Sequence, residues 1–426
     1  MDKTKIIFTK DKLTGFAGLK PFMQYLDKNL KIFSLFESKV SFYKRKRDFT
    51  KTDYFKSIFI LFTVGYEKLA HIFLLFNDHF ILRLIGVTKL PYPENIVRCF
   101  LDKFNFKHAY ELSRVQHVLV ASMHPKLFRL KTVTIDCDST PKDTHGHQEG
   151  TGKHYKNHNG YHPILAFIYE TKEFLHGFLR PGNTYTGNGI ERFIRECIAR
   201  LPFSICTITF RADSGFFNDA LMSLLESMGH FYLIAAKLYP TLVQRIIEIP
   251  SHAYQQFDQQ WQITTIHFSL DKWDKTRKFV VLRKLKKYSN QIALIGDANQ
   301  YEYQVYCTNL NDLTTKELVL FYRERGTCEN YIKEAKNDTR FKFFTVQKFW
   351  SNEALFQIAM LLYNTSIWFR AELISKKVAK ERLYTFRLKF IAIPGRLTTT
   401  GGEWFLHLNK DYRYRDLFEK FELALS

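Results

Sequence analysis

The sequence predicts an α/β protein with a mixed β-sheet, a β-rich insertion and helical regions at both ends. Apolar residues recur at helical spacing up to about residue 130, and from Lys131 the pattern changes to the two-residue alternation of a strand. Strand and helix patterns then alternate up to about residue 236, which is typical of an α/β domain. Short alternating segments follow between about 237 and 313, and a helical pattern resumes near Tyr322.

The composition indicates a folded protein with a polyanionic partner. The chain has 426 residues, 46% of them hydrophobic, and Lys and Arg outnumber Asp and Glu by 63 to 42, a net charge of +21. Such an excess favours nucleic acid as the partner, with an anionic membrane surface as the second candidate. We expect no membrane span, because Glu67, Lys68 and Asp78 interrupt the most apolar region, Phe55 to Val87.

The cysteines and the first residues suggest a cytoplasmic protein. The six cysteines are scattered, with no CxxC pair, which favours a reducing compartment and argues against a structural zinc site. The first residues, MDKTKIIFTKDKLTG, lack the apolar run and small-residue cleavage site of a secretory signal.

The pattern divides the chain into five parts. Residues 1–130 form a helical region, for which we propose DNA binding; its basic run from Lys44 to Arg47 fits phosphate contacts and a solvated loop about equally well. Residues 131–236 and 314–374 form the two parts of the core, 237–313 the β-rich insertion, and 375–426 a helical tail. The expected strands are 131–138, 161–169, 173–180, 205–211, 230–236, 262–270, 278–285, 292–298 and 301–308, and the main helices are 189–200, 215–227, 322–336, 352–374 and 380–391.

The helix expected over 322–336 carries a polar stripe. Tyr322, Arg325, Glu329 and Lys336 are spaced three, four and seven apart, which places them within about 60° of one another on a helix. One carboxylate flanked by two cations and a phenol can present a metal ligand beside groups that bind phosphate. Alternatively, Arg325 and Glu329 form an ordinary surface pair, worth a few tenths of a kcal/mol.

Two further acids stand at the ends of expected strands. Asp138 is followed by Ser139 and Thr140, and Asp213 follows the strand that ends near Arg211. In open α/β sheets, ligands gather at the carboxyl ends of strands. Together with Glu329, these aspartates can bind two Mg²⁺ ions, with Mn²⁺ as a substitute, in the arrangement that suits phosphodiester chemistry. Taken singly, each Asp is also a typical turn or cap residue.

These residues resemble the DDE transposases of bacterial insertion sequences, in the insertion-sequence-four superfamily. Its signature Tyr-x2-Arg-x3-Glu-x6-Lys matches Tyr322, Arg325, Glu329 and Lys336 without a gap. Asp138-Ser139-Thr140 and Asp213-Ser214-Gly215-Phe216 are similar to the segments of the first two acids, and Gly160-Tyr161-His162-Pro163 to a strand entry of the family. The resemblance extends over about residues 131–350. Asp136, two residues earlier on the same face, remains an alternative to Asp138.

The resemblance implies an RNase H-like core and cut-and-paste DNA transposition. Asp138, Asp213 and Glu329 would be the catalytic metal ligands, and Tyr322, Arg325 and Lys336 would bind phosphates near the scissile bond. Water would nick the transposon end, and the freed 3′-hydroxyl would join target DNA, with or without a hairpin intermediate. The expected partners are double-stranded DNA, in the form of terminal inverted repeats and target, and a second copy of the chain in a homodimer on DNA.

Two other functions and a few weaker site residues also stay open. The chain could be a transposase-derived DNA-binding protein without catalysis, or an RNase H-like nuclease that does not join strands. In the insertion, Trp273 could stack on a flipped base or simply pack, and Lys284 adds to a basic, salt-sensitive DNA contact. A His-rich loop, with His145, His147, His154, His158 and His162, favours a flexible segment near DNA over a zinc site.

Overall fold

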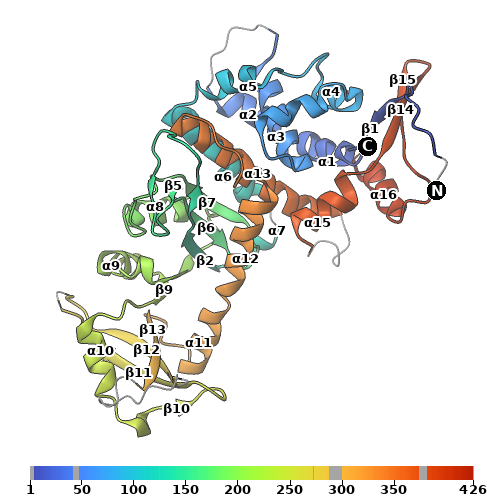
Figure 1. Cartoon of the computed structure of the whole chain (residues 1–426). Coiled ribbons are helices and arrows are strands. Elements are labelled where there is room, and N and C mark those ends of the chain that lie inside the picture. Colours follow the sequence, from blue (N-terminus) through green and yellow to red (C-terminus); the bar gives the residue numbers. More distant parts are fainter. Residues whose placement is uncertain are drawn as a thin grey trace.

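The protein is built on a nine-stranded mixed sheet (Figure 1). A computed structural model describes residues 4–41, 48–123, 125–271, 273–286, 300–373 and 381–425. The strand order is β10-β11-β12-β13-β9-β8-β2-β6-β7, and β8 is parallel to both β2 and β9. The core strands are β2 (Thr132–Ser139), β6 (Ile164–Ile168), β7 (Phe174–Phe178), β8 (Thr207–Ala212) and β9 (Phe231–Ala235). The mixed sheet and its helices agree with the expected fold class.

Helices cover both faces of the core strands. Phe167 on β6 contacts Tyr331 of α12 (Gly326–Lys333) and Tyr363 of α13 (Phe349–Leu373). On the other face, His176 of β7 stacks on Phe193 of α8 (Ile190–Ile198), and α9 (Asp219–Ser227) lies beside α8. Both faces of β2 are buried up to Cys137, and its two-residue pattern arises because one face carries Val133, Ile135 and Cys137 and the other carries the polar residues between them.

The β-rich insertion continues the core sheet. Its strands are β10 (Gln255–Gln256), β11 (Gln262–Phe268), β12 (Arg277–Leu285) and β13 (Tyr301–Thr308). β13 pairs antiparallel with β9, with Tyr306 opposite Ala235, so the insertion is anchored through backbone hydrogen bonds. It also contains the helix α10 (Pro240–Ile247), which begins with proline at its first turn. The strand expected over 292–298 lies outside the described residues.

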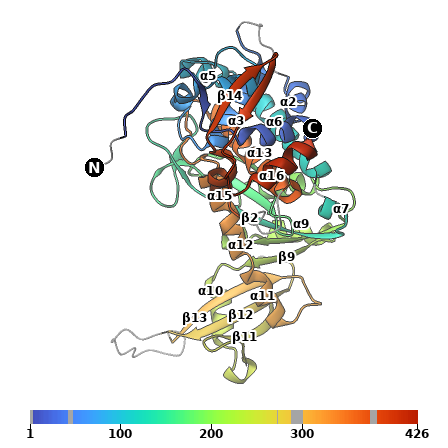
Figure 2. The ribbon, with the colours of Figure 1, turned by 90° about the vertical axis from the view of Figure 1, so that its right-hand side faces the viewer.

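The N-terminal helical region shares its hydrophobic core with the rest of the chain (Figure 2). Phe22 packs on Phe369 of α13, with ring centroids 5.2 Å apart, and Phe62 packs on Phe344. The region comprises α1 (Leu19–Gln24), η1 (Tyr25–Asn29), α2 (Ile32–Lys39), α3 (Lys51–Val64), η2 (Leu69–Leu75), α4 (His79–Ile85), α5 (Glu94–Leu101), α6 (Phe106–Met123) and α7 (Pro125–Phe128). A single core spanning both parts means that the helical region is fixed against the sheet domain.

The C-terminal part, expected to be helical, also contains a β-hairpin. Strands β14 (Gly395–Thr400) and β15 (Glu403–His407) pair with each other, and β14 pairs with β1 (Lys12–Thr14) near the N-terminus. The connecting Gly401 and Gly402 have φ values of 60° and 83°, which are typical of a type I′ hairpin turn. The helical elements here are α15 (Leu383–Phe386), η7 (Arg387–Ile391) and α16 (Arg415–Leu425).

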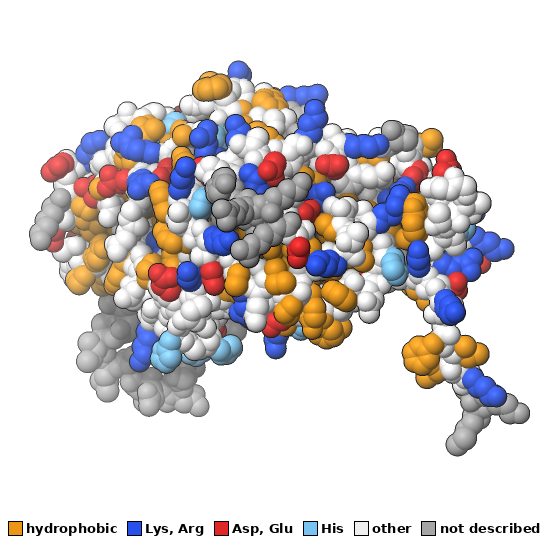
Figure 3. Space-filling model, turned by 90° about the horizontal axis from the view of Figure 1, so that it is seen from above, with side chains coloured by type: hydrophobic (Ala, Val, Ile, Leu, Met, Phe, Trp, Pro, Cys, Tyr) orange, Lys and Arg blue, Asp and Glu red, His pale blue; other side chains and the backbone are white. Residues whose placement is uncertain are grey.

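The helices and the surface charges bear on the two expected partners, a membrane and DNA. Among the described residues no single helix is long and apolar enough to cross a bilayer; α3 and η2 together meet the length and composition criteria but are bent by 87°. On the face seen from above, Lys and Arg side chains are interspersed with Asp and Glu (Figure 3). The basic run from Lys44 to Arg47 lies outside the described residues, so DNA binding by the helical region remains a prediction.

Candidate active site

The segment expected to be one helix, 322–336, is divided in the structure. Helix α11 (Thr315–Arg323) ends before Arg325, α12 begins at Gly326, and a π-helical segment, η6 (Glu334–Asp338), follows. At the break, the amides of Arg325 and Cys328 donate to carbonyls three residues earlier, which tightens the chain. Gly326, a poor helix former, stands at this point. The prediction of a single continuous helix was therefore wrong, and Tyr322 belongs to a different helix from the other stripe residues.

Asp138 and Asp213 leave neighbouring parallel strands at the same edge of the sheet. Asp138 is the second-last residue of β2, and Asp213 directly follows β8; Cys137 and Ala212, one residue earlier in each case, lie opposite one another. The Ser139 amide donates to Asp138 Oδ1 at 2.8 Å, and the Gly215 amide donates to Asp213 Oδ1 at 2.9 Å. Each carboxylate is thus oriented by one backbone amide, while its second oxygen is left for another partner.

The three acids border one cavity of about 950 Å³. Asp138, Asp213 and Glu329 line it together with Arg325 and Lys336. Burial raises the pKa of Asp138 to about 6; Arg325 opposes this effect, and the charges of Asp213 and Glu329 add to it. The three carboxylates are therefore close enough to repel one another, as expected for acids that share bound cations.

Two cationic side chains, Arg325 and Lys336, lie beside the acids and carry hydrogen-bond donors. Arg325 Nη2 lies 3.5 Å from Asp138 Oδ1, while its buried Nε has no hydrogen-bond partner among the described residues. Lys336 Nζ donates to Thr140 Oγ1 at 3.2 Å and to the carbonyl of Pro141, and burial lowers its pKa to about 8. Since Arg325 and Lys336 both line the cavity, an anion there would meet a guanidinium and a partly buried ammonium.

Tyr322 does not border the cavity. Its hydroxyl donates to the carbonyl of Ala212 at 3.3 Å, and its ring stacks on Tyr306 at 4.0 Å between centroids. Since Ala212 immediately precedes Asp213, Tyr322 holds the strand end from which that acid projects.

The two insertion residues also lie away from the cavity. Trp273 packs against Phe217 and Phe279, with centroid distances of 5.2 and 6.3 Å, and the Arg277 guanidinium lies 4.7 Å above its ring. Lys284 pairs with Glu302 at 3.0 Å and lies over the ring of Trp261. Trp273 is thus part of the packing of the insertion, and Lys284 is half-buried on its surface.

Asp136, the alternative first ligand, is fully buried and bound to Arg211 on both carboxylate oxygens. It does not line the cavity, whereas Asp138 does. The structure therefore brings only the second of the two β2 aspartates to the site.

In the His-rich loop, Asp143, His154 and His158 lie within reach of a common metal ion. However, the Lys156 amide donates to His154 Nδ1 at 3.2 Å, so this nitrogen is an acceptor and the ring proton is on Nε2. Nε2 lies 2.7 Å from Asp143 Oδ1 and donates to it. A metal-bound imidazole binds the ion through a lone pair on one nitrogen and donates a hydrogen bond through the other. In His154 the lone pair already accepts from the Lys156 amide and the other nitrogen donates to Asp143, so the ring is arranged for hydrogen bonding and not for metal binding.

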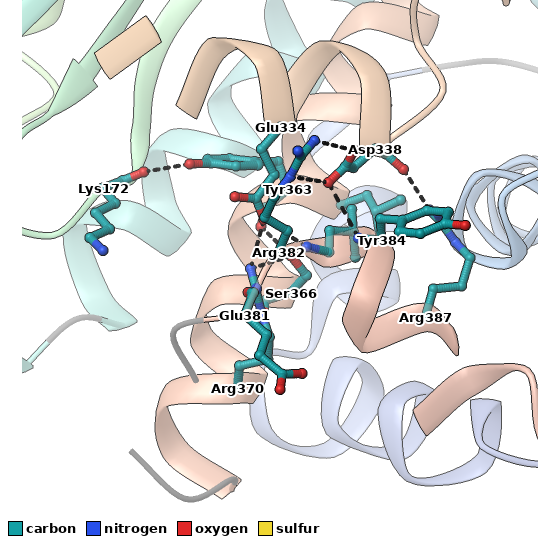
Figure 4. A network of polar contacts seen from close by, with 12 residues as sticks. Lys172, Glu334, Asp338, Tyr363, Ser366, Arg370, Glu381, Arg382, Tyr384 and Arg387 are labelled. Carbon is teal, nitrogen blue, oxygen red and sulfur yellow. Dashed lines mark hydrogen bonds and ion pairs between the residues drawn. The ribbon is translucent and has the colours of Figure 1, made fainter. Parts of the chain in front are cut away.

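A polar network fixes the end of the segment that carries Lys336 (Figure 4). Asp338 accepts hydrogen bonds from Arg382 Nε and Nη2 at 3.1 and 2.8 Å, and from the Tyr384 amide at 3.3 Å. Glu334 accepts from the Leu383 amide at 2.8 Å and from Arg370 Nη2 at 3.2 Å. The π-helical segment is thereby fastened to α13 and to the start of α15.

Several cavity residues were not assigned from the sequence. Thr186 and Lys342 line the cavity, and so does His162, which was grouped with the His-rich loop. The available signal for His162 was its position in Gly160-Tyr161-His162-Pro163, directly before β6, the strand paired with the end of β2.

A protein family and a solved structure are similar to this chain. A family model described as transposase DDE domain group 1 matches residues 5–426. A solved structure, the piggyBac transposase synaptic complex with hairpin DNA, is 12% identical, with a TM-score of 0.48, over 90% of this chain and 82% of that chain. No curated protein matches the chain.

Proposed function

Because this chain belongs to the DDE transposase family and is a DNA transposase, we propose that Asp138, Asp213 and Glu329 are its catalytic metal ligands. Transposases of this family use divalent metals. The donor set fits them, since it consists of carboxylates, and Glu329 is exposed with no partner among the described residues. Oxygen ligands suit two Mg²⁺ ions, with Mn²⁺ able to replace them. The observation that carries the proposal is that Asp138, Asp213 and Glu329 border one cavity, and that Arg325 and Lys336 border it with them.

The acids and the cations have different roles at the scissile phosphate: the acids bind metal and the cations bind phosphate oxygens. Bound divalent metal would activate the attacking oxygen and stabilise the leaving oxygen. Arg325 and Lys336, which both line the cavity, bind the non-bridging oxygens and hold the phosphate in place. Tyr322 contributes by bracing Asp213 through its bond to Ala212.

The reaction we propose is cut-and-paste transposition. Water attacks the phosphorus at the transposon end, and the 3′-oxygen of the element leaves as a hydroxyl. The second strand at this end is then cut, either by another water or by attack of the 3′-hydroxyl, which forms a hairpin that water reopens; either route frees the element. The 3′-hydroxyl finally attacks a phosphodiester of the target and displaces the target's own 3′-oxygen, so the number of phosphodiester bonds is unchanged in the joining step. The cavity serves every step, because each is an attack of water or a hydroxyl on the same kind of phosphate.

The partner is DNA, and we propose double-stranded terminal inverted repeats and target DNA as its forms. A homodimer on DNA would hold two ends together, and in bacteria the protein would act at the nucleoid. Lys284 and the N-terminal helical region would add contacts to the phosphate backbone, which weaken as salt increases.

The test compares wild type with Asp213→Asn and Glu329→Gln on DNA that carries the ends of the element. We expect both variants to bind the ends while cleavage and joining are lost. Cleavage in Mg²⁺ by either variant at the wild-type rate would refute the ligand assignment. A wild type that binds without cutting would instead be a DNA-binding derivative, and one that cuts without joining would be a nuclease.

A further inference from the structure

His162 is held rigidly at the edge of the catalytic cavity. Its amide donates to the carbonyl of Arg180 at 2.9 Å, and its own carbonyl accepts from Arg180 Nε at 3.0 Å. The residue is 5% exposed and lies between β5 (Asn159–Tyr161) and β6, next to the end of β2. This double anchoring fixes the backbone from which the imidazole projects, which is a requirement for a functional group in a site.

The hydrogen bond of the ring determines its tautomer. His162 Nδ1 lies 3.0 Å from the carbonyl oxygen of Thr184, which can only accept, so Nδ1 carries the proton. Nε2 of the neutral ring therefore presents a lone pair. This nitrogen is buried and has no hydrogen-bond partner among the described residues, an arrangement that costs about 1–3 kcal/mol unless a ligand satisfies it.

The contents of the cavity restrict what that ligand can be. Phosphate oxygens only accept hydrogen bonds, so DNA phosphate cannot satisfy a lone pair. His162 and Asp213 border the same cavity. Burial and the positive charge of Arg180 lower the pKa of His162, and the negative charge of Asp213 opposes this. A cation beside Asp213 is therefore the partner that suits the nitrogen best. In a metal-bound histidine, the ring nitrogen that does not bind the metal usually donates a hydrogen bond, often to a backbone carbonyl, as Nδ1 of His162 does to Thr184.

The imidazole of His162 also contacts a surface residue. Tyr155 packs edge-on against His162, with centroids 5.9 Å apart, and is 68% exposed on the turn before β5. This contact can open without disturbing the core.

We propose that Nε2 of His162 is a nitrogen ligand of a divalent metal bound by Asp213. The inference rests on the proposed function, since it adds a fourth protein ligand to the three carboxylates. A mixed nitrogen and oxygen set favours Mn²⁺ over Mg²⁺ relative to oxygen ligands alone.

The test uses Mn²⁺ as a probe of the full-length protein without DNA. Pulsed electron paramagnetic resonance detects the ¹⁴N coupling of an imidazole bound to Mn²⁺, independently of activity. His162→Asn is the informative variant, because an asparagine amide can still donate to the Thr184 carbonyl but has no equivalent of Nε2. His154→Asn removes another histidine of the same cavity and serves as the matched control.

We expect the ¹⁴N coupling in wild type and His154→Asn, its loss in His162→Asn, and an Mn²⁺ affinity about 10-fold or more lower in that variant. Coupling that persists in His162→Asn, or is absent from a wild type whose Mn²⁺ binding requires Asp213, would overturn the inference and leave the three-carboxylate site intact. If Mn²⁺ binds equally well to Asp213→Asn, the proposed site itself is refuted, and the inference with it.

Discussion

Arg211 holds Asp136 in a two-point ion pair inside the sheet domain: Nε lies 2.6 Å from Oδ1, and Nη2 lies 2.8 Å from Oδ2. Both side chains are fully buried, and the guanidinium also lies 4.6 Å from the ring centroid of Tyr169. Asp136 has its countercharge within the protein. This pairing separates the roles of two acids that share a face of β2, and it leaves Asp138 as the one that reaches the cavity.

The buried pair predicts a large loss of stability when one partner is removed. Asp136→Asn leaves the Arg211 charge buried without its carboxylate, so we expect the free energy of unfolding to fall by about 3–5 kcal/mol. Urea denaturation of the metal-free protein measures the change. Mn²⁺ binding by the folded variant should be retained. A variant of wild-type stability that no longer binds Mn²⁺ would show that Asp136 is the metal ligand.

Asp138 predicts a pH dependence of stability. Its pKa of about 6 in the folded protein exceeds the value of about 3.9 expected in the unfolded chain. Between these values the folded state binds more protons, so the free energy of unfolding falls as pH rises from about 4 to about 6. The loss is at most about 3 kcal/mol.

Asp138→Asn should remove this part of the pH dependence, because asparagine mimics the protonated acid. Without metal, the variant should match wild type near pH 4 and be more stable than wild type at pH 7.5, as measured by thermal unfolding at both pH values. Divalent metal should stabilise wild type at pH 7.5 and not at pH 4. Parallel pH profiles for the two proteins would show that Asp138 is not the group responsible.

The positions of the acids could be predicted from local pattern alone. Asp138 and Asp213 each follow a strand with clear alternation, and parallel neighbouring strands bring their ends to one edge. The position of Glu329 could be predicted because its spacing from Arg325 fits one helix. This spacing still holds in the structure, because Arg325 caps α12 and Glu329 lies within it.

The features that were missed depend on contacts between residues far apart in the chain. Asp136 and Arg211 are 75 residues apart, so nothing near Asp136 revealed its partner. The pairing of β13 with β9 is equally remote in sequence, which is why the insertion could not be joined to the sheet. The C-terminal hairpin is different: Gly401-Gly402 after a run of threonines is a local hairpin signal, although this part of the chain was expected to be helical.

Substitutions of Trp273 distinguish a role in packing from a role in stacking on a DNA base. Its ring contacts Phe217, Phe279 and Arg277, so Trp273→Ala should lower the free energy of unfolding by about 2–4 kcal/mol while DNA affinity of the folded protein stays within about twofold. Trp273→Phe, which retains much of the contact, should lose less. Equilibrium denaturation and a DNA titration at fixed salt give the two values. A loss of DNA affinity at unchanged stability would restore the base-stacking role.

The contacts of Asp338 predict how strongly the π-helical segment η6 is held in place. The carboxylate is almost fully buried and accepts three hydrogen bonds, two from Arg382 and one from the Tyr384 amide. Asp338→Asn keeps the shape but removes the charge and leaves donors unmatched, so we expect a loss of about 2–4 kcal/mol in urea denaturation.

The matched control is Glu419→Gln, which breaks the exposed i,i+4 pair of Arg415 and Glu419 and should leave the free energy of unfolding almost unchanged. If both substitutions have equally small effects, solvent screens the Asp338 pair as it does the surface pair. Lys336, two residues before Asp338, would then be held by its own contacts to Thr140 and Pro141. If only Asp338→Asn is destabilising, the network acts as the anchor from which the π-helical segment presents Lys336 to the cavity.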